Sequence, residues 1–77
     1  MRTTADLSAN QRRILEFLRG RIDEQTYFKS RTIGTELDMS AKEVGRNMTA
    51  LADGNVGIDV NRWGYSRSTT WEVTARG

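Results

Sequence analysis

The spacing of apolar residues along the chain changes at Gly54. Before this residue, apolar side chains recur every three or four positions, which is the spacing of helices with one buried face. After it, apolar and polar residues alternate over residues 56–60 and again over residues 69–73. That period of two is typical of strands with one buried face. The pattern therefore predicts an α+β fold, mainly α, with the helices first and a β-hairpin last.

The first helix is predicted over residues 9–22. It begins with a capping box at Ser8-Ala9-Asn10-Gln11, in which Ser8 accepts a hydrogen bond from the third amide of the helix and Gln11 bonds back. The apolar residues that follow lie within an arc of roughly 160°; they are Ile14, Leu15, Phe17, Leu18 and Ile22. The arginines of this helix are expected to form a solvated face; they are Arg12, Arg13, Arg19 and Arg21.

Two further helices are predicted before Gly54. Ser30 is expected to be the N-cap of a helix of about two turns that ends near Asp38. Ser40-Ala41-Lys42-Glu43 is a full capping box for a third helix, whose apolar residues are Val44, Met48 and Leu51. Gly54-Asn55 is expected to supply the left-handed residue that ends this helix.

The C-terminal hairpin is predicted to need a third strand. Its loop covers residues 61–68 and is basic and aromatic. Because an isolated hairpin is marginally stable, we expect residues 25–28, which are rich in strand formers, to pair with it. Trp71 and Tyr27 are expected to lie in the core. Trp63 and Tyr65 are expected to pack under the hairpin, with contact to DNA as the alternative.

The composition excludes several classes of protein. A chain of 77 residues without Pro or a repeat is expected to form one domain, 1–77, with an ordered core at about 8–74 and loose ends at 1–6 and 75–77. The absence of Cys and His removes disulfides, thiolate nucleophiles, imidazole bases and the usual zinc sites. The carboxylates are spread singly, so no enzyme, metal, cofactor or small-molecule substrate is expected. No apolar run reaches the length of a membrane span, and we expect a cytoplasmic protein.

The order of these elements resembles the winged helix-turn-helix, a family of DNA-binding domains. The resemblance covers about residues 8–74, with the helix-turn-helix at 31–51 and the wing at 56–74. Gly34 occupies the position where the motif needs a small residue for close packing of its two helices. The runs Tyr27-Phe28-Lys29-Ser30-Arg31 and Gly64-Tyr65-Ser66-Arg67-Ser68-Thr69-Thr70-Trp71 are also similar to small haloarchaeal winged-helix proteins. The family resemblance implies three helices, a small antiparallel sheet with a wing hairpin, and binding to double-stranded DNA.

The third helix carries the expected major-groove contacts. The chain has 12 Lys and Arg against 10 Asp and Glu, for a net charge of +2. Most of these cations are Arg, which pairs well with phosphate and with guanine edges. Three side chains are expected on the face opposite Val44, namely Lys42, Arg46 and Thr49. Gly45 lies beside them and is expected to permit close approach to the DNA.

Two other places are expected to contact phosphate. The second helix begins with two cations around a helix N-terminus, at Lys29, Ser30 and Arg31. The wing has no acidic residue between 60 and 71, and its candidate DNA contacts are Arg62, Trp63, Tyr65 and Arg67. Phosphate contacts of this kind set affinity and register without specifying sequence.

Two functions fit these patterns. The first is binding of double-stranded DNA by a small transcriptional regulator or chromatin-associated factor at the nucleoid. A homodimer is left open, because one such module buries little DNA surface. The alternative is a winged-helix protein-interaction module, in which the Lys42–Arg46 face is idle or meets an acidic protein.

Overall fold

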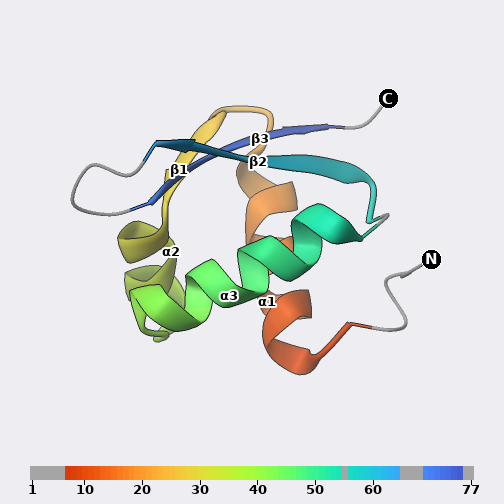
Figure 1. Ribbon diagram of the computed structural model, residues 1–77. Helices are drawn as coiled ribbons and strands as arrows, with labels where there is room; N and C mark the ends of the chain where they lie inside the picture. Colours follow the sequence, from red (N-terminus) through yellow and green to blue (C-terminus); the bar gives the residue numbers. More distant parts are fainter. Residues whose placement is uncertain (1–6, 55, 65–68, 76–77) are drawn as a thin grey trace.

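A computed structural model describes residues 7–54, 56–64 and 69–75 of the chain. Over these residues the chain forms an α+β fold with three helices and a small antiparallel sheet. Figure 1 shows their arrangement. The elements follow in the order α1 (Ala9–Arg21), β1 (Tyr27–Lys29), α2 (Ser30–Leu37), α3 (Ala41–Asp53), β2 (Ile58–Gly64) and β3 (Thr70–Ala75). The helices cover one face of the sheet (Figure 1). No helix in the described ranges is long and apolar enough to cross a membrane.

The sheet is held together by its last strand. The strand order is β1-β3-β2, and β3 pairs antiparallel with both neighbours. Phe28 of β1 and Arg62 of β2 both lie opposite Trp71 in the register. A strand of three residues such as β1 persists because β3 supplies its hydrogen bonds and α2 follows it without a break.

The core lies between the sheet and the helices. On α3, Val44, Met48 and Leu51 are fully buried, as the helical spacing predicts. They pack with apolar residues from α1, α2 and the inner face of the sheet; these include Ile14, Leu15, Leu18, Phe28, Ile33 and Trp71. The prediction that Trp71 is a core residue is confirmed.

Two side-chain caps begin the longer helices. The Ser8 Oγ accepts from the Gln11 amide at 3.2 Å, and Gln11 Oε1 accepts from the Ser8 amide, so the predicted capping box of α1 is confirmed. On α3, Ser40 Oγ accepts from the Glu43 amide at 3.1 Å. The Glu43 carboxylate does not complete that box, because its Oε2 accepts from Asn10 Nδ2 of α1 at 3.0 Å. Glu43 therefore links two helices.

The turn between α2 and α3 depends on a glycine. Asp38 ends α2 in the left-handed conformation, with φ of 58°. The Met39 amide then donates to the Gly34 carbonyl at 2.8 Å. A Cβ atom on Gly34 would collide with the backbone oxygen of Met39. The turn approaches α2 so closely that position 34 requires a residue without a Cβ atom.

Several details predicted from the sequence are wrong. The strand β2 runs to Gly64, so residues 61–64 belong to it and not to a loop. Gly54 is extended, with φ of −95°, so it is not the left-handed residue expected at the end of α3. The other residue named for that role, Asn55, lies outside the described residues. Tyr27 is 48% exposed and not in the core, because Phe28 occupies the inner face and strand neighbours alternate.

Candidate functional site

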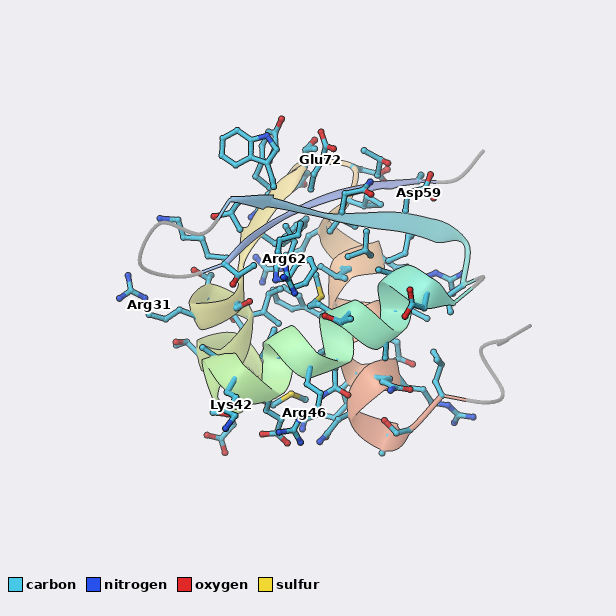
Figure 2. The ribbon with its side chains drawn as sticks, viewed as in Figure 1. Arg31, Lys42, Arg46, Asp59, Arg62 and Glu72 are labelled. Carbon is cyan, nitrogen blue, oxygen red and sulfur yellow. The ribbon has the colours of Figure 1, made fainter. Side chains whose placement is uncertain are left out.

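The exposed face of α3 carries two cations without partners. Lys42, Arg46 and Thr49 are exposed, opposite the buried stripe of the same helix. Figure 2 shows Lys42 and Arg46 extending from the side of α3 that is remote from the sheet. Within the described residues, neither side chain makes a hydrogen bond or ion pair. Their charges are thus available to a ligand.

Beside these cations, α3 has room for a side chain at Gly45. A Cβ atom added there would find no heavy atom of another part of the described chain within 4 Å. The Thr49 hydroxyl donates to the Gly45 carbonyl at 3.0 Å, so this hydroxyl is engaged with its own helix. The four residues predicted to form the helix surface are therefore contiguous on α3.

The predicted phosphate site at the start of α2 is only partly available. The N-cap is Lys29 and not Ser30, and no side chain caps this helix. Ser30 is buried; its Oγ accepts from Trp71 Nε1 at 2.8 Å, and its amide donates to the Thr69 carbonyl at 2.9 Å. Both polar groups of Ser30 are therefore used inside the domain. Lys29 and Arg31 are exposed, and Arg31 extends outward from the fold (Figure 2).

The two candidate residues on β2, Arg62 and Trp63, lie in different surroundings. The Arg62 guanidinium lies 5.2 Å from the centre of the Trp71 ring, on the helix side of the sheet (Figure 2). Trp63 is 64% exposed, and its ring contacts that of Tyr27 with centroids 5.0 Å apart. The prediction that Trp63 packs under the hairpin is wrong. The register shifts between Arg62 and Gly64, and the extra residue, Trp63, contacts the outward-facing Tyr27.

The other two wing candidates, Tyr65 and Arg67, lie outside the described residues.

One protein-family model, described as a domain of unknown function (DUF7123), matches residues 1–75. The chain belongs to the DUF7123 family. No curated protein and no solved structure matches it. The DUF7123 match covers every helix and strand, so each candidate residue on α2, α3 and β2 lies within the family's domain.

Within this DUF7123 domain the arginines of α1 contact other parts of the fold. Arg13 Nη2 donates to the carbonyl of Leu37, the last residue of α2, at 2.6 Å. Arg19 Nη2 donates to the Val56 carbonyl at 3.4 Å, and Arg21 lies over the Phe17 ring at 4.6 Å. All three side chains are exposed, so the expected solvated face is confirmed, and each of them also makes a contact within the domain. Sequence spacing contains no signal for the contacts of Arg13 and Arg19, because they join α1 to distant segments. Arg21 and Phe17 are four residues apart on one helix, a spacing at which side chains are neighbours.

The pocket beside α1 is too small for an ordinary ligand site. It has a volume of ≈ 150 Å³ and is lined by Arg12, Leu15, Glu16 and Arg19. Small-molecule sites usually have about 300–1,000 Å³. No group of acidic residues in the described ranges is arranged to hold a metal ion. The exposed cations of α3 and α2 are therefore the strongest candidate site.

Proposed function

We propose that this DUF7123 chain is a winged helix-turn-helix domain that binds double-stranded DNA, with α3 in the major groove. In this proposal α2, the turn at residues 38–40 and α3 form the helix-turn-helix, and β2 and β3 form the wing. The domain would act at the nucleoid as a small transcriptional regulator or chromatin-associated factor.

The observation that carries the proposal is the pair of cations on α3 that make no hydrogen bond or ion pair within the described residues. Lys42 and Arg46 are exposed and one helical turn apart, on a helix of 13 residues. Such a helix is about 20 Å long, and a major groove about 12 Å wide admits an α-helix. Lysine and arginine on the entering face can bond to guanine or to phosphate.

Arg62 and Arg31 extend the proposed surface beyond this face. A helix in a major groove has a phosphate backbone along both of its flanks, so cations beside the helix are useful as well as cations on it. Arg62 lies on the sheet side of α3, and Arg31 extends from the first turn of α2 (Figure 2). Ser30 and Trp63 are left out of the proposal, since Ser30 is buried and Trp63 contacts Tyr27 on the outward side of the sheet.

A binding titration with matched charge variants tests the proposal. We expect the wild-type protein to bind a fluorescent random-sequence duplex, measured by anisotropy, with an affinity that falls as salt rises. Arg46→Ala and Lys42→Ala should weaken binding without lowering Tm. Each contact with phosphate should reduce the salt slope by about one. A contact with guanine should instead cost about 1–3 kcal/mol at a particular sequence.

Arg12→Ala is the matched control, because it removes the same charge from an exposed position on α1. Duplex affinity should change little in this variant. If Arg46→Ala and Lys42→Ala bind every duplex as well as the wild-type protein does, the proposal is wrong. The result would then favour a protein-interaction module.

A further inference from the structure

Gly45 is an unfavourable residue for its place in the fold. It lies within α3, four residues after the start of a 13-residue helix. Glycine is the least favourable residue inside a helix apart from proline, because it loses the most backbone freedom on folding. A glycine at such a position destabilises the helix, so its presence needs a structural or functional explanation.

Nothing in the described part of the domain supplies that reason. Among the described glycines, Gly57 is the one with positive φ. The backbone conformation of Gly45 is therefore one that alanine adopts without strain. A Cβ atom on Gly45 would meet no other segment within 4 Å. Gly34 differs, because a Cβ atom there would collide with the Met39 backbone oxygen. The packing of the fold thus explains Gly34 and not Gly45.

Gly45 is half-buried and lies at the edge of the exposed cationic surface of α3. Lys42 precedes it by three residues and Arg46 follows it directly, and both are exposed. Thr49, one turn later, donates its hydroxyl to the Gly45 carbonyl. Beside these two long cationic side chains, the backbone at Gly45 is covered by no side chain of its own.

We infer that Gly45 is the point at which the α3 backbone lies directly against the floor of the major groove. This inference rests on the proposed DNA binding and identifies a positioning residue for it. The lack of a Cβ atom lets the helix approach the base edges closely enough for Lys42 and Arg46 to reach them. A methyl group at this position holds the helix away from the groove, although it improves the helix itself.

Gly45→Ala tests the inference because its two effects have opposite signs. The Tm of the free protein should rise by about 4–8 °C, since alanine is the better helix former. The affinity for the duplex should nevertheless fall by about tenfold or more, which is the size of a steric penalty in a tight contact. A larger side chain, in Gly45→Leu, should weaken binding further.

Gly20→Ala is the matched control. Gly20 lies in α1, and a Cβ atom there also meets nothing within 4 Å. This variant should keep the wild-type affinity. If Gly45→Ala binds as tightly as the wild-type protein, or if its Tm falls, the inference is overturned. DNA binding itself is judged separately by Arg46→Ala and Lys42→Ala, whose loss of affinity would stand even if Gly45→Ala binds normally.

Discussion

Ser30→Ala is expected to lower the free energy of unfolding by about 1–3 kcal/mol. The Ser30 Oγ accepts a hydrogen bond of 2.8 Å from Trp71 Nε1. Both residues are buried, with relative exposures of 3% and 2%. The variant leaves the indole N–H in the core without an acceptor, and the cost of that unpaired donor sets the size of the effect.

A loss of this size is large for so small a domain. A chain of 77 residues is expected to have a free energy of unfolding of roughly 4–12 kcal/mol. Each kcal/mol shifts the Tm of a domain in this size range by about 4–8 °C, so Ser30→Ala should lower Tm by at least about 4 °C.

Thermal and guanidinium unfolding, followed by far-UV circular dichroism, measure these quantities. Thr32→Ala is the matched control, because it removes a hydroxyl from an exposed position of the same helix and should change stability by no more than about 0.5 kcal/mol. Trp71→Phe removes the donor, so Ser30→Ala should cost much less in that background than in the wild-type protein. Equal costs in the two backgrounds, or a Ser30→Ala protein as stable as the wild type, would refute the reasoning.

Two further substitutions examine the turn and the start of α3. Gly34→Ala should destabilise the domain by about 1–3 kcal/mol in guanidinium unfolding, because the new Cβ atom displaces the Met39 carbonyl; a stabilised variant would show that the turn moves freely. Ser40→Ala should cost about 1 kcal/mol, since Ser40 Oγ accepts from the Glu43 amide. An unchanged Tm for Ser40→Ala would mean that this cap does not stabilise α3.

The candidate surface on α3 could be located from the sequence because it depends on local geometry. A capping serine at Ser40 sets the start of the helix, and the spacing of Val44, Met48 and Leu51 sets its buried face. Once both are known, a helix of 3.6 residues per turn puts Lys42 and Arg46 on the opposite side. The same reasoning gave the extent of α1, where Ser8 and Gln11 form the expected box.

The sequence alone determined the order of the helices and strands, the caps of the long helices and the face of α3 that remains exposed. These depend on contacts between residues within about four positions of one another. The partner of Ser30 is 41 residues away, and that of Glu43 is 33 residues away. The outward position of Trp63 depends on a register shift against β3. Such contacts arise only when distant segments pack together, because a short polar side chain bonds to whichever group the folded chain brings within reach.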